Sequence, residues 1–372
     1  MKILTFLLFA LVVWRMIWPL KSWYLKGALI ALAGAGAFKF QLFRIIGGHY
    51  FAPDLPEWVI MGGALLYGGF YFVPVLLLLS ETVRGFWRRK EQPFWNKINI
   101  GIAACALLLS TLALVLGALA PRVNHCIIVH PQVPEAADGM KAAFITDLHI
   151  DRSTKAEKIR EMVAQVNALQ ADVILLGGDL MDGSVAQCGA AVKELNGLKA
   201  PLGVLGVPGN HEYYSNFEAW HAYFKESSVK LLLNEETELP NGIVIAGIGD
   251  HAGRLFFRKN AALLEKYADF PEKALKGIET ERFVLFLAHR PKAARKGAAL
   301  GADLQLSGHT HGGMIWGFDK LVGLFNGGWV SGRYQVGKMT LLVSNGTWLW
   351  KGFPLRLGRP GEIVLVTLKR KK

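Results

Sequence analysis

Cysteine and charge are both scarce in this sequence. Its 372 residues include 3 cysteines, too few for a disulfide framework, and each is expected to be buried or unpaired. Charged residues make up 19% of the chain, against about 25% in an average soluble protein. Apolar residues reach 52%, which excludes a disordered chain, a coiled coil and a collagen-like repeat. The length predicts two or three structural units.

The net charge of +13 is concentrated at one end of the chain. Residues 1–125 carry 12 Lys and Arg against 4 Asp and Glu, whereas the remaining residues carry 30 against 25. Basic residues beside apolar segments set the orientation of membrane proteins. We therefore expect a lipid bilayer as a partner, and no nucleic acid.

Four apolar segments predict an all-α membrane domain. Trp58–Ser80 and Ile98–Pro121 contain no charged residue, and roughly 20 apolar residues suffice to cross a bilayer. Arg15 interrupts the first segment, for which a cleaved signal peptide is the alternative. Lys26 and Lys39, near the ends of the second, are expected to snorkel towards the interface. The domain is expected over residues 1–121, with spans near 3–20, 23–43, 58–80 and 98–120.

Residues 122–372 alternate β-rich runs with helical stretches. A leading strand and a turn-rich linker are expected over 122–139, followed by helices at Lys155–Leu169 and Ser184–Leu195. This alternation is typical of helices packed on a sheet, and the late strands, which lack helices between them, predict a second sheet that is mixed or antiparallel. The expected strands are Ala142–Thr146, Asp172–Leu176, Leu202–Val207, Gly242–Ala246, Phe283–Ala288, Asp303–Leu306, Met339–Val343 and Ile363–Leu368.

Polar residues gather in five short clusters that follow strand-like runs. Because open α/β sheets bind ligands at the carboxyl ends of strands, we expect the clusters to meet. They hold five of the ten histidines, too many for satisfied core residues. Carboxylate, imidazole and amide oxygen suit Mn, Fe, Zn or Co, and an Asp between two His clusters can bridge two ions. The clusters are Asp147-Leu148-His149, Gly178-Asp179, Gly209-Asn210-His211-Glu212, His289 and Gly308-His309-Thr310-His311.

The order D-x-H, G-D, G-N-H-E, H, G-H-x-H resembles the calcineurin-like metallophosphoesterase superfamily. The motifs cover about residues 140–312. The tail resembles a bacterial membrane-anchored branch, transmembrane proteins with a metallophosphoesterase domain, in Ser331-Gly332, Ser344-Asn345-Gly346 and Pro354-Leu355-Arg356. The resemblance implies an α/β fold, a four-layer αββα sandwich over residues 140–372, preceded by the all-α membrane domain of about four helices.

The resemblance also implies two divalent metal ions. One would be held by Asp147, His149, Asp179 and His311. The other would be held by Asp179, Asn210, His289 and His309, so that Asp179 bridges the pair.

Three further positions matter to the implied chemistry. His211 matches the family histidine that protonates the leaving group or steadies the phosphoryl oxygens, and Glu212 would orient it. Asp182 fits a G-D-x-x-D extension, with a structural and a functional role equally open. Gly183 stands where protein-phosphatase branches have an arginine, which argues against a phosphoprotein phosphatase.

The expected function is a membrane-anchored dinuclear-metal phosphoesterase that cleaves a phosphodiester or pyrophosphate bond in a phosphorylated, lipid-linked or membrane-associated substrate. The alternatives are a UDP-2,3-diacylglucosamine pyrophosphatase of lipid A synthesis, a nucleotide or cyclic nucleotide phosphodiesterase, and a membrane sensor or scaffold with an inert esterase fold. The complete ligand set argues against the last. Apolar residues after the final motif, such as Trp316 and Phe325, are either ordinary packing or a patch turned to the bilayer.

The basic residues between the last two spans predict the orientation. They are Arg84, Arg88, Arg89, Lys90 and Lys97. Such a loop should be cytoplasmic, which places everything after Pro121 outside the cytoplasm, at a bacterial inner or plasma membrane. The lipid A reaction occurs on the cytoplasmic side and therefore stays an alternative.

Reporters fused after Lys372 test this orientation. An alkaline phosphatase that works only outside the cytoplasm should be active, and a reporter that fluoresces only in the cytoplasm should stay dark. Neutral residues at the four positions 84, 88, 89 and 90 should give mixed topology, because the positive bias is removed. A fluorescent wild-type fusion whose sheet domain is cut by cytoplasmic protease would reverse the assignment and favour the lipid A precursor.

Overall fold

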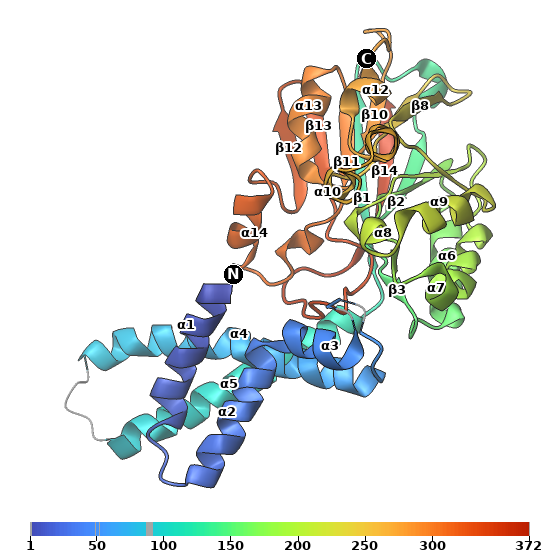
Figure 1. Cartoon of the computed structure of the whole chain (residues 1–372). Helices are drawn as coiled ribbons and strands as arrows, with labels where there is room; N and C mark the ends of the chain where they lie inside the picture. Colours follow the sequence, from blue (N-terminus) through green and yellow to red (C-terminus); the bar gives the residue numbers. More distant parts are fainter. Residues whose placement is uncertain (1, 49, 52, 87–91, 372) are drawn as a thin grey trace. The chain divides into compact units, whose positions relative to one another are not determined.

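The computed structural model describes residues 2–48, 50–51, 53–86 and 92–371 (Figure 1). The chain divides into two units. A helical unit comprises residues 1–118 and 351–357, and a sheet unit comprises residues 119–350 and 358–372. The late segment 351–357 thus belongs with the N-terminal helices.

The sheet unit contains, among its described residues, two six-stranded sheets and one short two-stranded pair. The first sheet is ordered β1 (Arg122–His130), β14 (Glu362–Arg370), β2 (Lys141–Ile145), β4 (Val173–Leu176), β6 (Val204–Gly206) and β7 (Val229–Leu231). The second is ordered β12 (Gly332–Val336), β13 (Met339–Val343), β11 (Leu304–Ser307), β10 (Val284–Leu287), β9 (Val244–Gly247) and β8 (Glu235–Glu238). The pair is β3 (Ile150–Asp151) with β5 (Met181–Asp182).

Both sheets are mixed. In the first, β14 runs antiparallel to β2, and the other neighbours are parallel. In the second, the edge strands β12 and β8 are antiparallel to their neighbours, and the inner strands are parallel. The predicted second sheet is therefore confirmed as a mixed one. The leading strand β1 pairs with the last strand β14, a neighbour that no local pattern indicates.

Several short helices connect these strands. Three of them cover the first sheet: α6 (Ala156–Asn167), α7 (Val185–Val192) and α9 (Phe217–Lys225). Two cover the second sheet: α12 (Pro271–Leu275) and α13 (Ala294–Ala299). The remaining helical segments of the unit are η2 (Glu135–Ala137), η3 (Lys193–Gly197), α8 (Asn210–Tyr214), α10 (Ala252–Phe256), α11 (Ala261–Tyr267), η4 (Pro291–Ala293), η5 (His311–Gly313) and α14 (Asp319–Phe325).

The side chains of β2 show how the layers form. Successive residues of a strand point to opposite faces of the sheet. Ala143 and Ile145 pack against α6, α7 and α9, whereas Ala142 and Phe144 pack between the two sheets. A third cluster lies between the second sheet and α12 and α13, and it includes Phe286 of β10. These three cores separate four layers, which confirms the αββα architecture.

The helical unit holds two described helices that are long and apolar enough to cross a membrane. They are Glu57–Gly85 within α4 (Glu57–Phe86) and Pro93–Ala118 within α5 (Gln92–Ala118). At about 1.5 Å per residue, each exceeds the roughly 30 Å of a bilayer's hydrocarbon core. They correspond to the predicted spans 58–80 and 98–120. Of the basic residues between them, Arg88, Arg89 and Lys90 lie outside the described residues.

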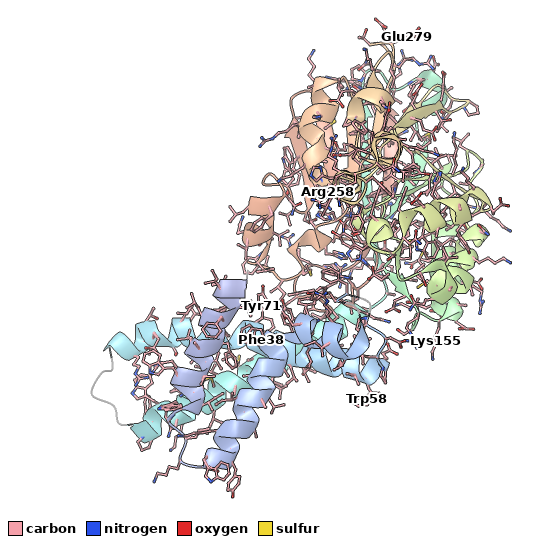
Figure 2. The ribbon with its side chains drawn as sticks, viewed as in Figure 1. Phe38, Trp58, Tyr71, Lys155, Arg258 and Glu279 are labelled. Carbon is pink, nitrogen blue, oxygen red and sulfur yellow. The ribbon has the colours of Figure 1, made fainter. Side chains whose placement is uncertain are left out.

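The first two predicted spans differ from expectation. The first is the short apolar helix Ile3–Ile17, formed by α1 (Lys2–Val12) and the π-helical turn η1 (Val13–Ile17). Its interrupting charge is satisfied, because Arg15 forms an ion pair with Glu81 of α4. The second breaks at Phe38 into α2 (Trp23–Ala37) and α3 (Lys39–Gly47), which meet at 83° (Figure 2).

Lys39 is the first residue after the break in the second segment. Its side chain is fully buried, and Nζ donates a hydrogen bond to the carbonyl oxygen of Gly352 at 2.6 Å. The same ammonium lies 4.7 Å from the centroid of the Phe40 ring. The charge of Lys39 therefore finds its partner inside the helical unit, close to the point where the segment bends. Lys39 is thus satisfied by a carbonyl of the chain itself, and its snorkelling towards the interface stays a prediction.

Replacing Lys39 by Met tests this contact. The buried carbonyl of Gly352 loses its donor, which should cost about 1–3 kcal/mol of stability. The midpoint of thermal unfolding in detergent should fall clearly below that of the wild type. Lys26→Met is the matched control, because the Lys26 ammonium only lies over the Trp18 ring, 5.2 Å from its centroid. Equal midpoints for the two variants would contradict the assigned role of Lys39.

Candidate metal centre

The five polar clusters follow parallel strands of the two sheets. Three come after β2, β4 and β6 of the first sheet, and two come after β10 and β11 of the second. The inter-sheet core packs these strands face to face, so their carboxyl ends open at a common edge. The expectation that sequence-distant clusters meet is correct.

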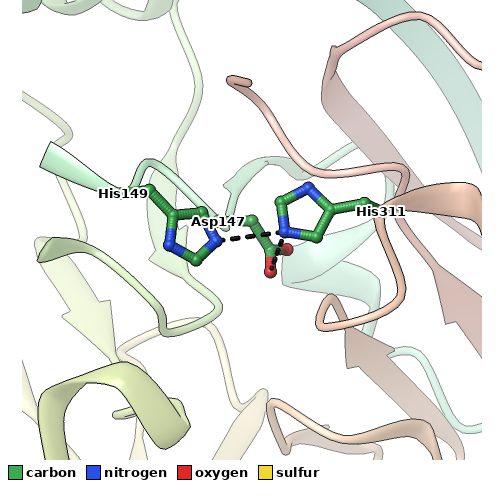
Figure 3. A group of neighbouring side chains, drawn as sticks. All are labelled: Asp147, His149 and His311. Atoms are coloured by element: carbon green, nitrogen blue, oxygen red, sulfur yellow. Dashed lines mark hydrogen bonds and ion pairs between the residues drawn. The ribbon is translucent and has the colours of Figure 1, made fainter. Parts of the chain in front are cut away.

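The first group of facing ligand atoms comes from Asp147, His149 and His311, all of them buried (Figure 3). The Nε2 atoms of the two histidines lie 3.0 Å apart, and Nε2 of His311 lies 3.5 Å from Oδ1 of Asp147. Two ring nitrogens and a carboxylate oxygen thus converge on one point.

The second group comes from Asp179, His289 and His309. Nε2 of His289 lies 3.1 Å from Oδ2 of Asp179 and 3.2 Å from Nδ1 of His309. Nδ1 of His289 is 2.8 Å from the carbonyl oxygen of Gly177 and donates its proton there. That bond fixes the tautomer that turns the lone pair of Nε2 towards the other two ligands.

Asp179 joins the two groups. Its Oδ2 lies 3.9 Å from Nε2 of His149, in addition to its contact with His289. Asn210 is the predicted source of one more oxygen. Its buried Oδ1 accepts no hydrogen bond from the described part of the chain, as expected of an atom that serves a cation. The donor set of carboxylate, imidazole and amide oxygen therefore fits two divalent ions.

The backbone around the site is held in an uncommon conformation. Of nine described non-glycine residues with positive φ, five belong to the clusters: Asp147, His149, Asp179, His309 and His311. Each costs of order 1–3 kcal/mol and persists only where neighbouring contacts impose it. Two such contacts are backbone hydrogen bonds from Asp147 to Gly178 (2.9 Å) and from His149 to Asp179 (3.0 Å).

Gly308 shows how closely the loops approach. A Cβ atom at this position would lie 2.2 Å from Oδ2 of Asp147. The next residue, His309, donates its backbone N–H to Oδ1 of Asp147 at 3.0 Å. The glycine thus allows the loop after β11 to hold the carboxylate that follows β2.

Asp182, and not Glu212, contacts the ring of His211. Oδ1 of Asp182 accepts a hydrogen bond from Nδ1 of His211 and lies 3.2 Å from Nδ1 of His149. The Glu212 carboxylate accepts backbone N–H groups instead, from Gly209 (2.7 Å), Leu180 (2.6 Å) and Asp179 (3.1 Å). The orienting contact that we expected from Glu212 is made by Asp182, and Glu212 ties two site loops together.

Burial and facing charges shift the pKa values in opposite directions. Burial raises the pKa of Asp147. Burial also opposes the charged form of Asp179, but His289 and His211 outweigh it and hold the pKa of Asp179 well below its ordinary value. Burial disfavours the charged ring of His211, yet Asp182 and Asp179 raise its pKa to about 9. The positive charge of protonated histidines thus offsets the negative charge of the buried carboxylates. Divalent cations can supply the same positive charge.

Two more side chains near the clusters have clear positions. The Trp350 ring stacks against His149, with centroids 5.7 Å apart, and against His311, at 6.1 Å. It therefore closes one side of the first group. His251 is exposed, and its Nδ1 lies 3.3 Å from Oδ2 of Asp269.

Comparisons with known proteins identify relatives of this chain. Residues 140–313 match the family model of the calcineurin-like phosphoesterases. An uncharacterized metallophosphoesterase of Helicobacter pylori is 34% identical over 62% of this chain and 60% of its own length. One from Aquifex aeolicus is 32% identical over 67% and 92%, and a transmembrane protein with metallophosphoesterase domain from Danio rerio is 30% identical over 70% and 60%. The chain thus spans about 60% of the length of the first of these relatives.

Asp179→Asn tests the shared carboxylate. A neutral amide is a poorer ligand than a carboxylate, so the purified variant should lose more than one metal ion per chain, measured by elemental analysis. Asp303→Asn is the control, because this carboxylate stands before β11, at the other end of that strand, and accepts the backbone N–H of Val284. Two ions retained in Asp179→Asn would refute the bridging position.

Proposed function

Because the chain belongs to the calcineurin-like metallophosphoesterase family, we propose that it is a metal-dependent hydrolase of phosphodiester or pyrophosphate bonds, anchored in a membrane by α4 and α5. One observation carries the proposal. A single buried carboxylate oxygen, Oδ2 of Asp179, faces ligand atoms from both sheets. That arrangement suits two ions that share a ligand.

The residues for each ion follow from the two groups. Asp147, His149 and His311 would hold one ion together with Asp179. His289, His309 and Asn210 would hold the other, again with Asp179. Two such ions lower the pKa of a bound water and neutralise the oxygens of a phosphoryl group. The donor set suits Mn, Fe, Zn or Co.

His211 is the proposed proton donor to the leaving oxygen. Its Nδ1 is held by Asp182, and its Nε2 lies 3.9 Å from Oδ2 of Asp179. The Nε2 edge of the ring therefore faces the shared carboxylate of Asp179. Asp182 orients the ring and favours its protonated form, which is the form that a general acid needs.

A membrane-associated substrate is supported by the surface that follows the His311 cluster. Trp316 is 78% exposed, and Leu324 and Phe325 of α14 are 77% and 67% exposed. Ile315 and Trp348, by contrast, are buried, so only part of this apolar stretch is ordinary packing. Exposed apolar side chains beside phosphate chemistry suit a substrate that carries hydrocarbon chains.

The test is hydrolysis of a chromogenic phosphodiester by the full-length chain in detergent. Activity should disappear with chelator and return when Mn is added. Asp179→Asn should be inactive under the same conditions. A chain that binds two ions but cleaves neither phosphodiesters nor pyrophosphates would instead support a sensor or scaffold.

The same assay examines the proton donor. His211→Ala should lower turnover by about 10²–10⁴-fold on a substrate with a poor leaving group. The loss should be smaller with nitrophenolate, which needs little protonation, and metal content should stay near normal. His251→Ala, at the exposed histidine, should behave as the wild type. An equal loss for good and poor leaving groups would argue against proton donation.

A further inference from the structure

A guanidinium group lies beside the second ligand group. Arg290 directly follows His289 after β10. Its Nε donates to the two carboxylate oxygens of Asp250, at 3.1 Å and 2.8 Å. Its Nη1 lies 3.4 Å from Nε2 of His309. Arg290 thus places a positive charge beside the Nε2 edge of the His309 imidazole.

Asp250 fixes the direction of this charge. The carboxylate side chain is 1% exposed, whereas that of Arg290 is 28% exposed. Oδ1 of Asp250 also accepts the backbone N–H of Ala252 at 2.7 Å, so the carboxylate itself is immobilised. Because Asp250 engages Nε, the Nη1 side of the guanidinium is directed towards His309 and partly open to solvent.

The tautomer of His309 determines whether its Nε2 can accept a hydrogen bond from Arg290. Nδ1 of His309 faces the other ligand atoms, since it lies 3.2 Å from Nε2 of His289. When Nδ1 gives its lone pair to a metal, the neutral ring carries its proton on Nε2. Nε2–H and the Nη1–H groups of Arg290 are then neighbouring donors that cannot bond each other. An acceptor placed between them can receive hydrogen bonds from both.

We propose that Arg290 and Nε2–H of His309 together bind an anionic oxygen of the substrate's phosphoryl group. A phosphate oxygen suits the site because guanidinium–phosphate hydrogen bonds are charge-assisted and directional. The inference rests on the proposed function and names the residues that recognise its substrate.

Tyr214 extends the same binding surface. Its hydroxyl is a hydrogen-bond partner of Arg290, and its ring centroid lies 5.2 Å from that of His211. Tyr214 is 36% exposed, so it borders solvent as well as the site. A substrate oxygen held by Arg290 would therefore lie on the side of the site where His211 is placed to protonate a leaving group.

The competing role for Arg290 is purely structural. Asp250 follows β9 and Arg290 follows β10, so their ion pair also ties two neighbouring loops together. A structural role predicts lost stability or lost metal when Arg290 is changed, with normal phosphate affinity once metal is restored. A binding role predicts weaker phosphate binding at full metal content.

The experiment is calorimetric titration of inorganic phosphate into the full-length, metal-loaded chain in detergent, with metal content measured on the same samples. Arg290→Gln should weaken phosphate binding by about ten- to a hundredfold, the usual worth of a charged hydrogen bond. The matched control is Arg254→Gln. Arg254 pairs with Asp269, and its Nη2 donates to the Asp269 carbonyl oxygen at 2.6 Å, so it offers a similar ion pair in α10.

Wild-type phosphate affinity in Arg290→Gln at full metal content would overturn the proposal, as would a loss that metal saturation alone restores. If Arg290→Gln does not fold, Arg290→Lys decides. It keeps the charge but lacks the planar guanidinium that bonds Asp250 through Nε while Nη1 faces His309. Binding should therefore still weaken, and unchanged binding would overturn the proposal. Phosphate binding is measured without turnover, so these outcomes stand whether or not the chain proves to be a hydrolase.

Discussion

The sheet unit depends on the placement of one buried carboxylate, that of Asp179. An unpaired charge in a protein interior costs several kcal/mol, so this group persists only because positive or polarisable partners face it. His289 lies 3.1 Å from its Oδ2, and His149 and His211 lie 3.9 Å away. These histidines come from loops of both sheets, so the inter-sheet core has to be formed before the charge can be satisfied.

The loops around Asp179 are likewise held by contacts between segments that are distant in the sequence. Five of the clustered residues adopt positive φ, and hydrogen bonds between the loops hold them there. The Glu212 carboxylate accepts hydrogen bonds from three backbone N–H groups of two loops. Ligands fixed in this way are pre-organised for cations and need little rearrangement when a cation binds. The strain is localised where the chemistry is expected.

The helical unit also contains charged side chains in apolar surroundings. Lys39 is satisfied by the carbonyl of Gly352, and Arg15 by Glu81, so charges in apolar helices find partners within the unit. The segment Lys351–Leu357 belongs to this unit although it follows Trp350, which stacks on His149. Within the segment, Arg356 donates its backbone N–H to Ala113 of α5 at 2.9 Å. The tail motif Pro354-Leu355-Arg356 is thereby explained as part of the helical packing.

The layered α/β fold could be predicted from the sequence, and so could the meeting of the five polar clusters at one edge of the sheets. Apolar runs of strand length fix where the chain is buried, and polar residues at their ends have to gather at the carboxyl edge of a parallel sheet. The two strongest apolar segments were likewise readable from length and lack of charge. These features depend on burial, which the local order of apolar and polar residues predicts.

Partners between distant loops were decided only by the tertiary structure. Asp182 rather than Glu212 contacts the ring of His211, and Lys39 bonds to the carbonyl oxygen of Gly352. Asp250 accepts from Nε of Arg290, whose Nη1 lies beside His309. The first strand β1 lies beside the last strand β14 for the same reason. A local pattern of residues reports which side chains are buried. It does not report which donor meets which acceptor, because a hydrogen bond depends on the distance and direction that packing imposes on segments far apart in the chain.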